Sequence, residues 1–381
     1  MKKLLVLIFV GVFAAGIVVN AKGADVINKE VKKRFLAHST QEVAEALKRG
    51  CDIVKYMKAK DIKAIVRCAE TAGGALGLQE DVKVYAADAG ANAQIGANVV
   101  HAGGNTGAGR KIAVLDTGYN YLHPELSSSY IAAGYDFVNN DSDPMDDNGH
   151  GSHVAGLITA DGATTTARGV APDAGIVPMK VLGADGSGFF SDVVEAIYLA
   201  VNGPDGVFGT GDEVGVDAIS LSLGTGAPFV TKGYCDGWMP DMTEAVKYAL
   251  SRNIITVVAA GNDASGVSMP GCISYSATVG AVDASDNIAF FSGRGNAVDI
   301  VAPGVSLFSS WLGSSYASAS GTSMATPIIS GTIALVKSAH PSYSAIQVQN
   351  AIAKTAKDLG KKGKDSIFGW GRVIADKAVL Y

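Results

Sequence analysis

The sequence lacks any concentration of positive charge. Its 31 Lys and Arg residues are outnumbered by 36 Asp and Glu residues, which gives a formal net charge of −5, and no run of basic residues is longer than three. Proteins that bind a phosphate backbone usually carry a basic patch or stripe. The composition therefore gives no reason to expect a nucleic-acid partner.

Two kinds of short motif are also absent. The four cysteines are not paired at the short intervals typical of zinc sites, and no Gly-Lys-Ser or Gly-Lys-Thr triplet is present to hold a phosphate. No period of internal repeats appears. The sequence thus indicates neither a zinc site nor a phosphate-binding loop, and we expect no catalytic cofactor.

Only one stretch is apolar over a length close to a membrane span. Residues 1–21 begin with Met1-Lys2-Lys3, run apolar over residues 4–19 and end in small residues, which is typical of a cleaved signal peptide. The alternative is an uncleaved anchor, because the run approaches the roughly 18 residues that a spanning helix needs. Gly11 and Gly16 interrupt the run and favour cleavage. We expect a secreted protein with no membrane attachment after cleavage.

Four cysteines in an exported chain are expected to oxidise. Two lie in the N-terminal part of the chain and two in the remainder, so Cys51–Cys68 and Cys235–Cys272 is the economical pairing among three possibilities. A hairpin turn near residues 58–61 would place Cys51 and Cys68 opposite each other, within disulfide reach. Buried free thiols are the alternative.

After the signal peptide about 360 residues remain, which predicts two units. The first, residues 22–88, alternates strand and helix patterns in the order βαββαβ, a small α+β domain. The predicted elements are residues 31–39, 40–50, 51–58, 62–70, 71–79 and 81–87.

The second unit, residues 89–381, alternates apolar strands with helical stretches, which predicts an α/β fold with a mainly parallel central sheet. The predicted strands are 112–115, 177–182, 218–221, 254–259 and 273–282, and the predicted helices are 151–160, 191–202, 242–251, 323–339 and 345–355. In such sheets the functional site lies at the carboxyl ends of the strands.

Three motifs of this second unit complete one chemistry. Asp116 follows an apolar strand, His150 opens a Gly-rich helix start in residues 148–156, and Ser323 lies in a Gly-Thr-Ser turn in residues 321–327. A serine hydroxyl needs a base within hydrogen-bond reach, and that base needs a partner to hold its tautomer. The chain order Asp, His, Ser is that of the subtilisins.

On these motifs the chain resembles the subtilisin-like serine proteases, the subtilase family. The resemblance runs from about Gln94 to the end of the sequence. It implies the family's three-layer fold and an endopeptidase in which Ser323 is the nucleophile, His150 the general base and Asp116 its partner. Asn262 matches the family residue that donates to the oxyanion.

The resemblance also implies where a peptide substrate binds, as a strand added between two chain segments. One edge is Gly186, Ser187 and Gly188; the other is Ser222, Leu223 and Gly224; the walls of the pocket are completed by Ala259, Ala260 and Gly261. These segments carry no charge, which indicates broad cleavage beside uncharged side chains. The alternatives are a narrow processing peptidase or ligase on the same site, or a catalytically inert binding protein of this fold.

An acidic loop lies just before His150. Thermitase-like relatives bind calcium in this loop, and the resemblance implies the ligands Asp136, Asn139, Asp141 and Asp143 for a structural Ca²⁺. A solvated acidic turn is the alternative.

The first unit resembles the propeptide of the family, which acts as a folding template and an intramolecular inhibitor. Residues 82–88 would then occupy the substrate cleft, and a small, flexible segment at residues 86–93 would be cut between Tyr85 and Gln94 to release the enzyme. A small independent binding domain is the alternative. We expect a monomer whose partners are peptide substrates and its own propeptide.

Overall fold

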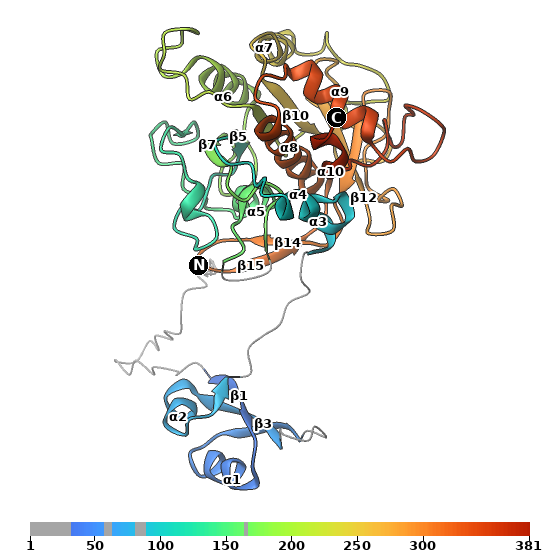
Figure 1. The fold of residues 1–381 in the computed structure, drawn as a ribbon. Helices are drawn as coiled ribbons and strands as arrows, with labels where there is room; N and C mark the ends of the chain where they lie inside the picture. Colours follow the sequence, from blue (N-terminus) through green and yellow to red (C-terminus); the bar gives the residue numbers. More distant parts are fainter. Residues whose placement is uncertain (1–31, 57–62, 81–88, 164–166) are drawn as a thin grey trace, which may run out of the picture. The chain divides into compact units, whose positions relative to one another are not determined.

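The computed structural model describes residues 32–56, 63–80, 89–163 and 167–381. These fall into two compact units, residues 1–85 and 86–381 (Figure 1). The predicted signal peptide at residues 1–21 lies outside the described residues. So do the predicted turn at 58–61 and the predicted strand at 81–87.

The first unit is a four-stranded antiparallel sheet with two helices. Its elements are β1 (Lys32–Ala37), α1 (Thr40–Lys48), β2 (Asp52–Tyr56), β3 (Ala64–Ala69), α2 (Glu70–Ala75) and β4 (Gln79–Glu80), and the strand order is β2-β3-β1-β4. Helix α1 begins after Ser39, whose hydroxyl accepts from the backbone N–H of Glu42 at 3.1 Å. The register of β2 and β3 pairs Asp52 with Arg67, so the preceding pair, Cys51 and Cys68, can form a disulfide across 4.4 Å between Cα atoms.

The second unit is built on a seven-stranded parallel sheet in the order β13-β12-β10-β8-β5-β7-β6. In chain order its strands are β5 (Lys111–Asp116), β6 (Tyr135–Asp136), β7 (Gly175–Lys180), β8 (Ala218–Leu221), β10 (Ile255–Ala259), β12 (Ala277–Val282) and β13 (Ile300–Pro303). Two antiparallel pairs lie outside it, β9 (Val230–Thr231) with β11 (Val267–Ser268), and β14 (Leu307–Ser310) with β15 (Tyr316–Ala319).

Helices cover both faces of this sheet (Figure 1). They are α3 (Ala89–Ile95), α4 (Ala97–Ala102), α5 (His150–Thr159), α6 (Phe190–Asn202), α7 (Pro240–Ser251), α8 (Thr322–Ala339), α9 (Ala345–Thr355) and α10 (Ala375–Val379), with a 3₁₀ turn at Ser127–Ser129. Along β5 the buried side chains alternate: Ile112 and Val114 join a core with α5 and α8, whereas Ala113 and Leu115 join a core with α6 and α7. The predicted three-layer α/β fold is therefore confirmed.

The sheet brings the three motifs to one edge. Strand order reverses at β5, which has β7 on one side and β8 on the other. Asp116 is the last residue of β5, His150 the first of α5 and Ser323 the second of α8. This is the switch point at which parallel sheets bind ligands.

The segment predicted as a flexible linker is partly a packed helix. Ala89–Ile95 forms α3, and Asn92 donates its side-chain amide to the carbonyl of Arg168 at 2.8 Å. Gln94 donates to the carbonyl of Asp283 at 2.9 Å. The prediction of a loose segment up to residue 93 is therefore wrong for residues 89–93, because these long-range contacts override a composition of small residues.

Candidate active site

Asp116 and His150 form the central contact of the site. Nδ1 of His150 lies 2.7 Å from Oδ1 of Asp116, and the same oxygen accepts the backbone N–H of Thr117 at 2.7 Å. Asp116 is fully buried, whereas 29% of the His150 side chain is exposed. Because Nδ1 faces the carboxylate, Nε2 is the ring nitrogen left to exchange a proton.

The environment of His150 stabilises its protonated form. Burial opposes a positive charge on the ring, but the charge of Asp116, its hydrogen bond and the more distant charge of Asp146 outweigh burial. The pKa of His150 consequently lies above its ordinary value. His150 can therefore accept a proton, and the negative charge of Asp116 stabilises the resulting imidazolium.

The second histidine of the same helix has a different environment. His153 is fully buried, and its Nε2 lies 3.1 Å from the carbonyl oxygens of both Leu307 and Ala317. Burial lowers the pKa of His153 to about 4, so it stays neutral at physiological pH. Its contacts attach α5 to the β14–β15 hairpin.

Asp146 forms hydrogen bonds with both the Asp116 motif and the His150 motif, and this role was not predicted from the sequence. One carboxylate oxygen accepts from the hydroxyl of Thr117 and the N–H groups of Asn148 and Gly149, at 2.9–3.0 Å. The other accepts the N–H and hydroxyl of Ser152, at 2.8 and 2.6 Å. An Asp shortly before a helix is a capping signal, but the sequence gives no sign that this one also binds the residue after Asp116.

Ser323 lies in the first turn of α8 and lines the same cavity as His150. Its hydroxyl donates to the carbonyl of Ser222 at 3.0 Å. The structure therefore does not pair Ser323 with His150. Catalytic hydrogen bonds in free enzymes are often loose and tighten when substrate binds, and rotation of one side-chain torsion redirects this hydroxyl.

Asn262 is oriented by the start of the same helix. Its Oδ1 accepts the backbone N–H of Thr322 at 2.9 Å and the hydroxyl of Thr322 at 3.0 Å. Two donors on one oxygen define the flip of the amide, so Nδ2 points away from Thr322. This amide N–H₂ and the N-terminal N–H groups of α8 are donors at one side of the cavity.

The cavity measures about 710 Å³. Eight of the nine predicted substrate-binding residues line it: Gly186, Ser187, Gly188, Ser222, Leu223, Gly224, Ala259 and Gly261. Ala260 is not among the lining residues: it is fully buried, and its N–H and carbonyl bond to Val279 and Ser268. The side chain of Ala260 belongs instead to the core that α6 and α7 cover, so Ala260 does not form the predicted wall.

Other residues of the lining were not predicted. Phe189 and Phe190 border the cavity beyond Gly188, and Asp263 places a carboxylate at its margin. Hydrogen bonds from Ser265 hold the pKa of Asp263 below its usual range, so it is charged at neutral pH. Residues 186–188 form no regular strand in this structure, although they lie where an edge was predicted.

Comparison with known proteins identifies the family. Residues 107–371 match the model of the subtilase family, peptidase S8. The chain belongs to the subtilase family of serine endopeptidases. Subtilisin BL of Lederbergia lenta is 40% identical over 286 residues, which are 75% of this chain and 96% of that protein. An alkaline protease of Shouchella clausii is also 40% identical, over 75% of this chain and 68% of its own length.

A third relative, the thermophilic serine proteinase of Bacillus sp. (strain AK1), is 39% identical over 72% of this chain and 62% of its own length. As a subtilase the chain acts on peptide bonds by serine chemistry. Within the described ranges, no helix is both long and apolar enough to cross a membrane.

The acidic loop of this subtilase does not gather its predicted ligands. Asp136 accepts the N–H groups of Val138 and Asn139 with one oxygen and the side-chain amide of Asn139 with the other. Asp141 accepts the N–H of Asp143, and Asp143 accepts the hydroxyl of Tyr121. Among the residues that the structure describes, no three His, Cys, Asp or Glu side chains form a metal-binding group. As placed, the four side chains do not fit a calcium site, because Asn139 presents nitrogen rather than oxygen to Asp136.

Proposed function

We propose that this subtilase is secreted as an inactive precursor and, once processed, hydrolyses peptide bonds with broad specificity through Asp116, His150 and Ser323. The observation that carries the proposal is the 2.7 Å contact between a buried Asp116 and His150, which lines one cavity together with Ser323 and Asn262. These are the groups that acyl transfer needs at one site.

In the proposed mechanism the substrate carbonyl lies between Ser323 and Asn262. The hydroxyl of Ser323 leaves the carbonyl of Ser222, gives its proton to Nε2 of His150 and attacks the substrate carbon. Asp116 holds the ring and offsets the charge that it gains. His150 then gives the proton to the leaving amine, and a water molecule releases the acyl group by the same steps.

The negative oxygen of the tetrahedral intermediate needs donors that are already in place. We assign this role to Nδ2 of Asn262 and the backbone N–H of Ser323 at the start of α8. One donor of this kind contributes about 2.7–4 kcal/mol to lowering the barrier in a subtilisin. Thr322 supports the role of Asn262, because its two hydrogen bonds leave Nδ2 free to face a substrate.

Broad specificity predicts the outcome of a peptide-library digest. The lining consists mainly of glycine, serine and apolar side chains, and it includes one exposed carboxylate, that of Asp263. We expect cleavage after many uncharged residues, with differences of tenfold or so between similar side chains. Mass spectrometry of the products measures the preference. Cleavage at a single short motif, or transfer of the acyl group to an amine in place of water, would support the processing or ligase alternative.

The first unit is proposed as a propeptide that templates folding and blocks the cleft. Its βαββαβ pattern supports this, and so does a catalytic unit built on non-local parallel pairings, which fold slowly. Because residues 89–95 are packed as α3, we place the maturation cut before residue 89.

This proposal predicts the behaviour of separated parts. Residues 89–381 expressed alone are expected to give little active enzyme, and adding residues 22–88 in trans is expected to restore part of the activity. N-terminal sequencing of the incubated, purified precursor locates the cut. Full and rapid activity of residues 89–381 alone would show that the first unit is not a required template.

Calcium binding is proposed from the sequence of the acidic loop alone. A cation there requires Asn139 to turn its amide so that oxygen replaces nitrogen, and the loop to exchange internal hydrogen bonds for ligation. The proposal predicts that EDTA lowers the melting temperature while the chemistry persists, because in the described part of the chain none of the four proposed ligands is hydrogen-bonded to Asp116, His150 or Ser323. A site held at 100 times its dissociation constant contributes about 2.7 kcal/mol. Identical melting curves with calcium and with EDTA would eliminate the site.

A further inference from the structure

One wall of the cavity belongs to a segment with almost no core of its own. Residues 224–239, here called the wall segment, leave the end of β8 and return to the start of α7, and Gly224, Thr225 and Gly226 line the cavity. Every residue of this segment is described, and Cys235 is its one buried residue, with 2% exposed. Apolar burial of other side chains therefore contributes little to its position.

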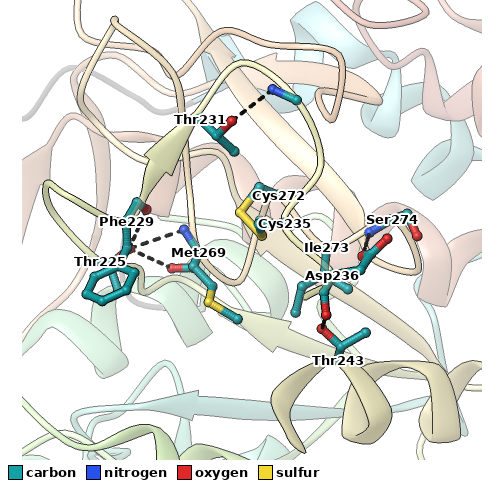
Figure 2. The surroundings of a disulfide bond; sticks show 12 residues. Thr225, Phe229, Thr231, Cys235, Asp236, Thr243, Met269, Cys272, Ile273 and Ser274 are labelled. Atoms are coloured by element: carbon teal, nitrogen blue, oxygen red, sulfur yellow. Dashed lines mark hydrogen bonds between the residues drawn. A yellow bond between two sulfur atoms is a disulfide. The ribbon is translucent and has the colours of Figure 1, made fainter. Parts of the chain in front are cut away.

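The wall segment is attached to a second loop that also reaches the cavity. Thr225 donates its backbone N–H to the carbonyl of Met269 at 2.9 Å, and its hydroxyl accepts the N–H of Met269 at 3.2 Å. In the β9–β11 pair, Val230 lies opposite Ser268, which also lines the cavity. Figure 2 shows the contacts between Thr225 and Met269 on one side of the disulfide.

The Cys235–Cys272 disulfide closes this attachment. Cys235 donates its N–H to the carbonyl of Cys272 at 3.1 Å, and Cys272 donates its own N–H to the carbonyl of Ser268 at 3.1 Å. Beyond the bridge, Asp236 accepts the N–H of Ser274 at 2.8 Å (Figure 2). The covalent bond is thus one turn from a residue of the cavity surface and anchors the only buried position of the wall segment.

We propose that the Cys235–Cys272 disulfide is a specificity-determining element of the active-site cavity. It holds Gly224–Gly226 against Ser268, whose side chain also lies against Gly261, so that the pocket for the side chain before the scissile bond keeps its width. This inference rests on the proposed function, because it assigns that side chain to the cavity. A preformed pocket binds a large side chain without first ordering a loop, whereas a small side chain makes few contacts with the wall. Loss of the disulfide is therefore expected to lower kcat/KM for substrates with a large side chain at this position more than for substrates with a small one.

The test compares the mature enzyme with a Cys235→Ser/Cys272→Ser variant on peptide anilides that differ only in having Ala, Leu or Phe before the cleaved bond. We expect kcat/KM for Phe relative to Ala to fall at least about fivefold, mainly through KM. The rate of inactivation by a small organophosphate, which has no such side chain, is expected to stay within about twofold. The matched control is Val348→Ala, which removes buried side-chain volume from α9, in the core that contains α5 and α8. Val348 does not line the active-site cavity.

The outcomes separate the possible roles of the bridge. An unchanged Phe-to-Ala ratio in the cysteine variant, or the same ratio change in Val348→Ala, overturns the proposal and leaves the disulfide a purely stabilising bond. A parallel loss of organophosphate reactivity also overturns it, because the effect would then lie at the chemical centre. No organophosphate reaction in the wild-type enzyme would contradict the proposed function itself. If the cysteine variant does not fold, reduction and alkylation of the folded, mature enzyme gives the same comparison.

Discussion

Replacing Ser323 with alanine is expected to lower turnover of a peptide substrate at least ~10⁴-fold and to leave a folded, unprocessed precursor. The reason is that the Ser323 hydroxyl oxygen is the attacking atom. The N–H donors that remain in the cavity are not nucleophiles and cannot take over this role. Initial rates on a chromogenic peptide, with gel analysis of the precursor, measure both effects.

Ser338→Ala is the matched control for this substitution. Ser338 lies in the same helix, α8, near its opposite end and away from the cavity lining. This variant is expected to process itself and to retain near-normal turnover. Near-normal hydrolysis by Ser323→Ala would show that another residue is the nucleophile.

Replacing Asp116 with asparagine is expected to lower kcat/KM about 10⁴-fold, the loss typical of such a substitution in a protease with the same three groups. The amide keeps the shape of the carboxylate but favours the wrong tautomer of His150. It also removes the negative charge that holds the pKa of His150 above its ordinary value. The pH profile of kcat/KM reports both consequences.

The direction of the pH effect follows from the state that catalysis needs. His150 must be neutral to accept a proton, so the wild-type rate falls as pH drops through its raised pKa. Without the carboxylate, burial lowers the pKa of the ring, and the acid limb of the residual activity is expected to move to lower pH. Asp241→Asn, in the first turn of α7, is the charge-matched control and should leave the limb unchanged. An acid limb that stays in place in Asp116→Asn would contradict the assigned pair.

Local signals explain why much of the fold could be predicted from the sequence. Helix α9 has the predicted bounds because Ser344 and Gln347 form a capping box that marks its start. The buried strands of the parallel sheet are continuous apolar runs, and their order between helices indicated the α/β class. Strand β12 begins at Ala277 rather than at residue 273, because Ile273 accepts the N–H of Ser276 in a preceding turn.

The β14–β15 hairpin could not be predicted because tertiary contacts stabilise it. Its strands, Leu307–Ser310 and Tyr316–Ala319, are rich in small polar residues and carry a weak strand pattern. His153 bonds to carbonyls of both strands, and Asn120 donates to the carbonyl of Gly313 between them. The partners lie far away in sequence, so no local signal reports them.

The candidate site divides in the same way. Asp116, His150, Ser323 and Asn262 lie in motifs whose residue types follow from the chemistry, and the structure brings all four to one cavity or its immediate wall. The role of Asp146 could not be predicted, because its hydrogen bonds join Thr117 and Ser152, which lie in two motifs far apart in the sequence. The error at Ala260 came from treating residues 259–261 as one wall, although the side chain of Ala260 lies in the core.

Labelling with a serine-directed organophosphate distinguishes Ser323 from every other candidate nucleophile. Ser323 as the nucleophile predicts one covalent adduct per mature molecule, located on Ser323 by peptide mass mapping. We expect no adduct in Ser323→Ala and much slower formation of the adduct in His150→Ala. Stoichiometric labelling of a different residue, or equal labelling of the Ser323→Ala protein, would contradict the assignment of Asp116, His150 and Ser323 as the catalytic groups.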